Sequence, residues 1–211
     1  MQRVLIVVLV VFSLSLLASP AAEMGRVPVR QGAREEAIPT VKDYAGAMSE
    51  GGPGLNVMMA WNSLDFEIGD EEYSDESWSP QASFTYGIGS MFDLRATVKY
   101  MEGSEKGVDL SAIRLGVGAR GWIKLKSDFQ PYFGGHLNYY LLDIEQGSGN
   151  DGMFGVEGEA GLAYLINEFW AVHLGLFYET SVSDGSTTIA DAEEDVKLSA
   201  FGVGFGFNVV F

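Results

Sequence analysis

Charged side chains that could pair or move protons recur at alternate positions in the part of this 211-residue chain that follows residue 53. They are four cations and three carboxylates: Arg95, Lys99, Arg114, Arg120, Glu157, Glu159 and Glu179. The two histidines, His136 and His173, fall on the same row. Residues two apart point to one face of a β-strand, so these groups are expected to share a face. Buried charges persist only when they are paired or hydrated. The set therefore predicts either a closed network of ion pairs or a polar path for ions.

Composition excludes several other kinds of chemistry. The chain has no cysteine, which excludes disulfides, thiolate metal sites, a cysteine nucleophile and a lipid-anchored amino-terminal cysteine. Its 29 acidic against 13 basic side chains, a formal net charge of −16, disfavour a nucleic-acid partner. Gly116-Val-Gly118-Ala-Arg-Gly121 matches a dinucleotide-binding pattern but lies within a predicted strand, where the required strand–turn–helix unit is missing. We therefore expect no cofactor and no metal centre.

The elements that position these groups are predicted to be eight antiparallel β-strands. Large apolar residues alternate with smaller ones in roughly ten-residue segments broken by turn residues. The strands are expected near 54–65, 80–90, 93–102, 108–124, 129–142, 153–165, 169–182 and 196–211. Residues 66–79, 103–107, 143–152 and 183–195 are expected to be mostly long loops, and residues 90–92, 126–128 and 166–168 tight turns. The even number of strands places both termini at the end with the tight turns.

The two faces of these strands predict what surrounds them. One row is bulky and uncharged, and it ends with Phe201, Val203, Phe205, Phe207, Val209 and Phe211. The other row is small or polar and carries the charges. An eight-stranded barrel has an interior that side chains just fill, so the bulky row must face outward. Only hydrocarbon accommodates so large an apolar surface, and aromatic rings bunch at strand ends as in interfacial belts. A soluble ligand-binding barrel would show the reverse pattern. The fold is therefore predicted to be an all-β, up-and-down transmembrane barrel.

The first 21 residues are predicted to be a secretory signal peptide. Arg3 precedes an apolar run at residues 4–17, and Ser19 and Ala21 fit cleavage after Ala21, with Ala22 as an alternative. An uncleaved anchor is disfavoured because a spanning helix needs roughly 20 apolar residues. Residues 22–53 are polar and contain three prolines, so we expect a periplasmic leader there. The barrel domain is expected at residues 54–211.

The last strand carries a family resemblance. Its sequence, FGVGFGFNVVF, ends on Phe211 with Phe207 and Val209 at alternate positions before it. It resembles the terminal signal that outer-membrane barrels present to the barrel assembly machinery. Residues 54–211 as a whole resemble the small outer-membrane barrels of the OmpA transmembrane-domain and OmpX type. The resemblance implies a bacterial outer-membrane location and contacts with membrane lipids and lipopolysaccharide. It departs from the full OmpA plan, because we expect no peptidoglycan-binding domain after the barrel.

Three functions are compatible with this resemblance. The leading hypothesis is a non-enzymatic envelope protein whose lumen is filled by polar side chains and whose loops serve surface structure or adhesion. The second is a narrow, porin-like pore for ions or small solutes. The third is a lipid-A-modifying enzyme, since some enzymes on small barrels use a histidine. A group that acts on lipid must reach the outer surface, and His136 and His173 are predicted to point inward.

The predicted outer loops are strongly acidic. Their carboxylates are Asp70, Glu71, Glu72, Asp75 and Glu76, then Asp143, Glu145 and Asp151, then Asp184, Asp191, Glu193, Glu194 and Asp195. Oxygen-rich loops can bind calcium, but this spacing matches no EF-hand loop. We expect solvated negative loops, with cation bridges to lipopolysaccharide phosphates as an open hypothesis. The extracellular ligand is not identified by these residues.

Overall fold

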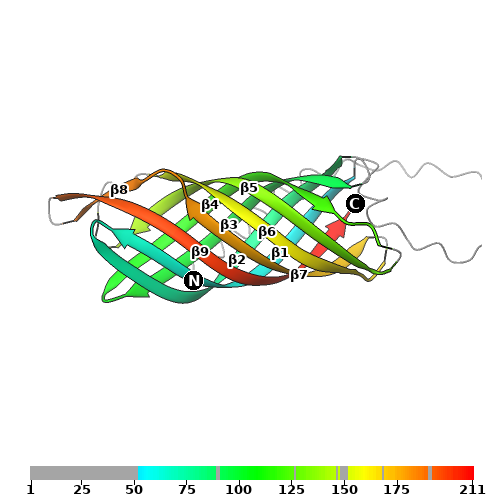
Figure 1. Ribbon diagram of the computed structural model, residues 1–211, viewed down its shortest axis with the longest axis horizontal. Coiled ribbons are helices and arrows are strands. Elements are labelled where there is room, and N and C mark those ends of the chain that lie inside the picture. Colours follow the sequence, from blue (N-terminus) through cyan, green and yellow to red (C-terminus); the bar gives the residue numbers. More distant parts are fainter. Residues whose placement is uncertain are drawn as a thin grey trace, which may run out of the picture.

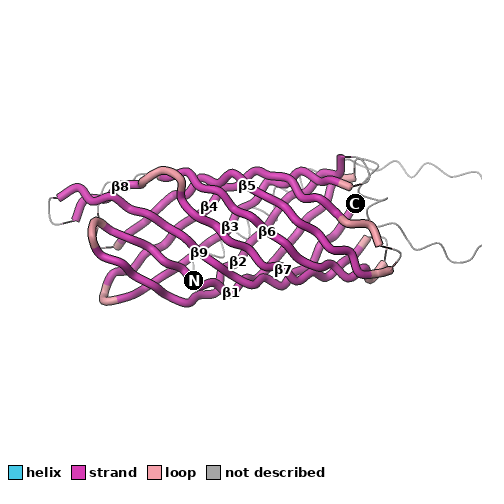
Figure 2. Tube along the Cα trace, in the orientation of Figure 1, coloured by secondary structure: helices cyan, strands magenta, loops and turns pink. Residues whose placement is uncertain are grey.

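The computed structural model describes residues 52–88, 91–125, 127–145, 147, 152–167, 169–189 and 192–211. The predicted signal peptide and the predicted leader as far as residue 51 lie outside these ranges. The described part of the chain forms nine strands in one sheet (Figures 1 and 2). They are β1 (Pro53–Ile68), β2 (Glu71–Ile88), β3 (Phe92–Glu105), β4 (Val108–Trp122), β5 (Phe129–Ile144), β6 (Met153–Leu165), β7 (Trp170–Ser181), β8 (Gly185–Ile189) and β9 (Ala192–Val210). None of the described residues forms a helix long and apolar enough to cross a membrane.

The sheet closes on itself with eight strand positions around the barrel. Neighbouring strands from β1 to β7 pair in sequence order, β9 follows β7, and β9 also pairs with β1, all antiparallel. The additional strand β8 continues the position of β7 along β9, after an interruption at residues 182–184. More residues lie on the β7–β8 side than on the β9 side at this interruption, as in a β-bulge. The predicted eight-stranded barrel is therefore confirmed, with its seventh position divided into two strands.

Both ends of the described barrel chain lie at one end of the molecule. Gly54 is registered with Val210, and the N–H of Phe211 donates to the carbonyl oxygen of Pro53 at 2.9 Å. We call this the terminal end, and the opposite end, which contains the β1–β2 turn, the distal end (Figure 1).

The prediction of a long loop at residues 66–79 is wrong. Strands β1 and β2 continue through this segment to a two-residue turn at Gly69–Asp70, and β3 and β4 meet at a similar turn, Lys106–Gly107. Gly69 has a φ of +59°, and Lys106 and Gly107 have φ values of 54° and 82°. Positive φ values at these positions are typical of tight hairpin turns whose twist matches the strands. The loop predicted at 183–195 likewise contains β8 and the start of β9.

The inside and outside of the barrel exchange character towards the distal end. In most of the barrel the bulky row is outside, with Leu137 68% and Val117 62% exposed. At the distal end, by contrast, apolar side chains fill the interior. This distal cap consists of Leu64, Phe66, Ile68, Tyr73, Met101, Leu110, Ala112, Tyr140, Leu142, Ile144, Met153, Val196, Leu198 and Ala200. On β1 the exchange falls between Trp61, on the outer face, and Leu64, on the inner face.

Carboxylates surround the distal cap on its outer face. This acidic collar consists of Asp65, Glu67, Glu72, Glu76, Glu102, Asp109, Asp143, Glu193 and Asp195, all of them exposed or half-buried. An apolar interior with a charged exterior is the arrangement of a barrel in water. The weak β-propensity of acidic residues is one reason why residues 66–79 and 183–195 are predicted to be loops from the sequence.

Candidate functional site in the barrel lumen

The lumen is built in layers along the strands. At the terminal end, an apolar cluster fills it, which we call the terminal plug: Trp122, Tyr132, Ala163, Leu165, Ala171 and Val210. Two groups of charged side chains follow, and the distal cap closes the other end. Alternation along β3 produces this order, because Asp93, Arg95, Lys99 and Met101 all point inward at successive heights.

The charged group nearer the terminal end, which we call the lower group, lies next to the terminal plug. Arg95 from β3 and Arg120 from β4 both bind Glu159 of β6, with Arg120 Nε 3.1 Å from Glu159 Oε1. The guanidinium carbon of Arg120 lies 4.1 Å from the ring centroid of Tyr132, which joins this group to the plug. Arg95 also donates to Ser83 Oγ at 3.0 Å. One carboxylate therefore neutralises two guanidinium groups only in part.

Asp93 supplies a further carboxylate at this level, and it is not among the charges predicted from the sequence to lie in the lumen. It is completely buried, and its Oδ2 accepts a hydrogen bond of 2.7 Å from Trp122 Nε1. With Asp93 included, the seven predicted lumen charges become four cations and four carboxylates among the described residues. The signal was present, because Asp93 stands two residues before Arg95 on the inward row.

The upper charged group is the more deeply buried of the two. Lys99 binds Glu179, and Arg114 binds both Glu157 and Glu179, with Arg114 Nη1 2.7 Å from Glu179 Oε2. The side chains of Lys99, Arg114 and Glu179 are 0% exposed. Tyr140 donates to Glu179 Oε2 at 3.1 Å. A buried carboxylate that accepts from three donors is well satisfied, which offsets the cost of removing its charge from water.

Both histidines lie inside the barrel, as their sequence positions predicted. His136 Nδ1 is 2.8 Å from Glu157 Oε1 in the upper group. His173 contacts Asn56, and its Nδ1 is 3.3 Å from the hydroxyl of Tyr132 in the plug. The two histidines are 4% and 2% exposed. Neither ring reaches the outer wall, where a lipid substrate would lie.

No metal centre is formed by the part of the chain that the structure describes. It contains no group of three or more acidic or histidine side chains placed to hold a metal ion. Asp151 and Asp191, which the calcium hypothesis includes, lie outside the described residues. Calcium binding by the acidic segments stays a hypothesis.

The comparisons with known proteins decide the family. The family model for the outer membrane protein beta-barrel domain matches residues 9–208. This chain belongs to that family. The chain is therefore a protein of the bacterial outer membrane, and the predicted localisation is confirmed.

Solved structures of outer-membrane barrels share the fold at low sequence identity. Neisserial surface protein A is 15% identical, with a TM-score of 0.55 over 74% of this chain and 97% of its own. OprG from Pseudomonas aeruginosa is 16% identical, with a TM-score of 0.51 over 75% and 95%. AlkL, solved in DMPC bilayers, is 12% identical, with a TM-score of 0.54 over 89% and 96%. Among curated protein sequences, none matches this chain. These identities support a common fold and carry no residue roles.

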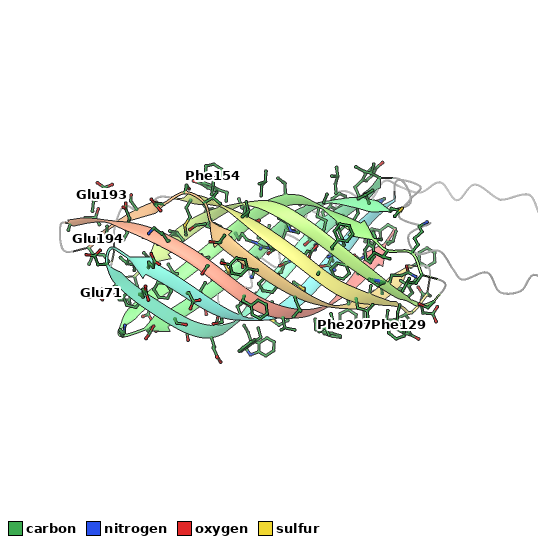
Figure 3. The ribbon with its side chains drawn as sticks, viewed as in Figure 1. Glu71, Phe129, Phe154, Glu193, Glu194 and Phe207 are labelled. Carbon is green, nitrogen blue, oxygen red and sulfur yellow. The ribbon has the colours of Figure 1, made fainter. Side chains whose placement is uncertain are left out.

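The membrane location gives the exchange of inside and outside a physical meaning. Phe129, Phe154 and Phe207 project from the outer wall, whereas Glu71, Glu193 and Glu194 gather at the distal end (Figure 3). An apolar, uncharged surface suits the hydrocarbon of a membrane, whereas a charged surface suits water. The apolar outer wall therefore lies in the hydrocarbon, and the distal cap and the acidic collar extend beyond it into water. Phe211, Val209 and Phe207, the predicted assembly signal, lie on the outer face at the terminal end, with Phe211 69% exposed.

Proposed function

We propose that this outer-membrane barrel is a closed, non-enzymatic envelope protein that holds an acidic collar above the outer leaflet, in a surface-structural or adhesive role. The observation that carries the proposal is the filled lumen. Apolar clusters occupy both of its ends, and between them four cations and four carboxylates balance each other. Water-filled porin lumens are polar and open along their length, which is a different arrangement.

The pairing of the lumen charges supports a plug over an ion path. Every cation of the two charged groups has a carboxylate partner among the described residues. Breaking a buried pair leaves an uncompensated charge, so the network resists opening. The positions of both histidines in the lumen also favour a non-enzymatic role over lipid modification, because a reacting lipid would lie outside the wall.

Single-channel recording in a planar lipid bilayer tests the proposal. We expect folded, purified barrel to give no stable conductance steps. A Glu157→Gln/Glu159→Gln variant should be equally silent, because the distal cap and the terminal plug remain. Uniform steps in the wild-type protein that change in this variant would establish the narrow pore in place of the closed barrel.

The outer-membrane partners follow from the same proposal. Lipids contact the outer row, lipopolysaccharide surrounds the acidic collar, and the assembly machinery reads the terminal strand that ends at Phe211. A binding assay with whole cells tests the adhesive role. Cells that carry a collar variant with Glu72, Glu76 and Glu102 changed to glutamine should bind less to surfaces coated with cationic polymer than wild-type cells. Equal binding would contradict a role for the collar in adhesion.

A further inference from the structure

Strands β2 and β3 separate before they reach the distal end. Their ladder runs from Ile88–Phe92 to Gln81–Lys99 and stops there, although β2 continues to Glu71 and β3 to Glu105. Pro80, the next residue of β2, has no N–H to offer a ladder. On their other sides, β2 stays paired with β1 and β3 with β4 up to their turns. We call the line between residues 71–80 and 100–105 the seam.

The seam turns the distal end into two sheets that face each other. One consists of the distal parts of β2, β1, β9 and β8, and the other of those of β3, β4 and β5. The distal cap lies between them, with Leu64 and Phe66 from the first sheet and Met101 and Leu110 from the second. The seam is therefore a line along which this apolar core could be uncovered.

Two carboxylates bridge the seam in a reciprocal arrangement. The N–H of Ser74 on β2 donates to the carboxylate of Glu105 on β3. In return, the N–H of Ser104 on β3 donates to Asp75 Oδ2 on β2 at 2.8 Å. Each strand thus satisfies one backbone amide of the other with an acidic side chain. Hydrogen bonds to an ionised acceptor are stronger than those between neutral groups, and these two link the strands where the ladder is missing.

Close packing beneath the seam shows what these bonds hold in place. A Cβ atom built on Gly103 would lie 3.0 Å from Leu64 Cδ2 and 3.7 Å from Asp75 Cβ. Strand β3 therefore rests directly on the first sheet at this position, and glycine permits the approach. Lys106, in the turn that follows β3, also donates to the carbonyl oxygen of Glu72 at 3.2 Å.

We propose that Asp75 and Glu105 form a latch on the β2–β3 seam, whose release parts the two sheets above the membrane while the barrel within the membrane stays closed. The ladder from Gln81–Lys99 down to Ile88–Phe92 is continuous, and the ion pairs of the lumen lie at or below this level. Separation of the two sheets therefore stops at Gln81 and Lys99, where the ladder between β2 and β3 begins. It exposes the apolar cap and two strand edges to the outside of the cell.

Hydrogen exchange of the full chain in lipid nanodiscs tests the latch. In an Asp75→Ala/Glu105→Ala variant we expect peptides covering residues 71–79 and 100–105 to exchange about tenfold faster or more, since each lost bond was to a charged acceptor. Peptides covering residues 81–88 should keep the wild-type rate. The matched control is Glu76→Ala/Glu102→Ala, which removes the same charge from the same two strands but from side chains that point outward. If the control accelerates exchange as much as the latch variant, the proposal is overturned.

A covalent lock provides an independent test. The 3.7 Å between Asp75 Cβ and a Cβ on Gly103 suits a disulfide, whose Cβ atoms are on average about 3.8 Å apart. The Leu64 and Phe66 side chains, 3.0 and 3.3 Å from that Cβ, must shift by a few tenths of an ångström to admit it, in the oxidised and the reduced form alike. The chain has no cysteine of its own, so Asp75→Cys/Gly103→Cys can form no other bridge. We expect slow exchange across the seam in the oxidised form and fast exchange after reduction. Equal exchange in the two forms would show that the seam does not open and would overturn the proposal. Bilayer conductance should stay absent in every variant, which separates this test from that of the closed lumen.

Discussion

Lys99 and Glu179 form an ion pair across the whole width of the lumen. Lys99 projects from β3 and Glu179 from β7, which are four positions apart in either direction around the closed sheet. Both side chains are 0% exposed, and Lys99 Nζ also lies 4.0 Å from the centroid of the Phe177 ring. The pair ties opposite walls of the barrel together at the level where the lumen changes from polar to apolar.

The first prediction concerns this pair. Glu179→Gln should lower the free energy of unfolding by about 3–5 kcal/mol, because it leaves Lys99 charged and unpaired in the lumen. The double variant Lys99→Met/Glu179→Gln should recover most of the loss, since no unpaired charge remains. Urea unfolding in lipid vesicles, followed by tryptophan fluorescence, measures both. As a control, Glu67→Gln breaks the exposed pair with Lys197 and should change little. A double variant as unstable as the single one would contradict the prediction.

The second prediction locates the membrane on the outer wall. Leu137→Arg should destabilise the barrel by about 2–4 kcal/mol, because it places a cation in hydrocarbon near the middle of β5. Asp143→Arg changes the same face of the same strand within the acidic collar, where water is expected. It should cost much less. Equal costs in vesicle unfolding would place both positions in the same medium and would contradict the assigned boundary.

The third prediction concerns the distal cap. Phe66 is 1% exposed and stacks on Tyr73 with ring centroids 5.0 Å apart. Phe66→Ala should cost about 3–5 kcal/mol, as expected for the loss of a buried aromatic side chain. Phe154→Ala is the control, because Phe154 is 61% exposed on the outer wall. Vesicle unfolding compares the two, and a larger loss for Phe154→Ala would show that the cap is not a packed core.

The fourth prediction concerns pH. Tyr73 donates to Glu71 Oε2 at 2.7 Å, and this bond, followed by burial, raises the pKa of Tyr73 above its ordinary value of 10.0. A raised pKa means that folding favours the neutral phenol. Its contribution to stability is therefore complete below the ordinary value and is lost as the pH rises through the raised pKa. An NMR titration of the Tyr73 ring carbon measures the shift, and Glu71→Gln should reduce it. Titration of Tyr73 at or below the ordinary value would refute the assignment.

The fifth prediction concerns the assembly signal. Deletion of Phe211 should reduce the amount of barrel in the outer membrane of cells, yet leave refolding of the purified chain in detergent unchanged. The side chain of Phe211 is 69% exposed, so folding itself depends little on it. Phe201→Ala, on the same face of β9 and far from the terminus, should not affect the cellular amount. A deleted chain that fails to refold in detergent would instead assign Phe211 a structural role.

Most of the architecture could be predicted from the alternation of residue types. Strands β3 to β7 begin and end within a few residues of the predicted bounds, and the outer and inner rows are on the predicted faces. The loop at 66–79 was mispredicted because its alternation changes phase. After Trp61 the apolar residues move to the inward positions Leu64, Phe66 and Ile68, and acidic residues take the outer ones. If the apolar residues are expected at the same alternate positions along the whole strand, such a segment resembles a polar loop.

The residues around the lumen were predicted as a set, but not their pairing. The alternation of side chains along each strand places Arg114, Glu157 and Glu179 on the inside. It does not indicate that Arg114 binds both carboxylates. Which charges meet depends on the register between strands that are distant in sequence. Asp93 was missed because it is the first residue of the predicted strand, although its partner Trp122 lies on the neighbouring strand, two residues beyond the Arg120 that is registered with Asp93.

By itself, the sequence determined the strand period, the two faces, the acidic exterior and the absence of cysteine chemistry, because these depend only on residue type and spacing along one strand. The tertiary structure decided which charges pair, where the lumen closes and where β2 separates from β3. Those features depend on the register and curvature of a closed sheet, in which residues as far apart in sequence as Ser74 and Glu105 come into contact.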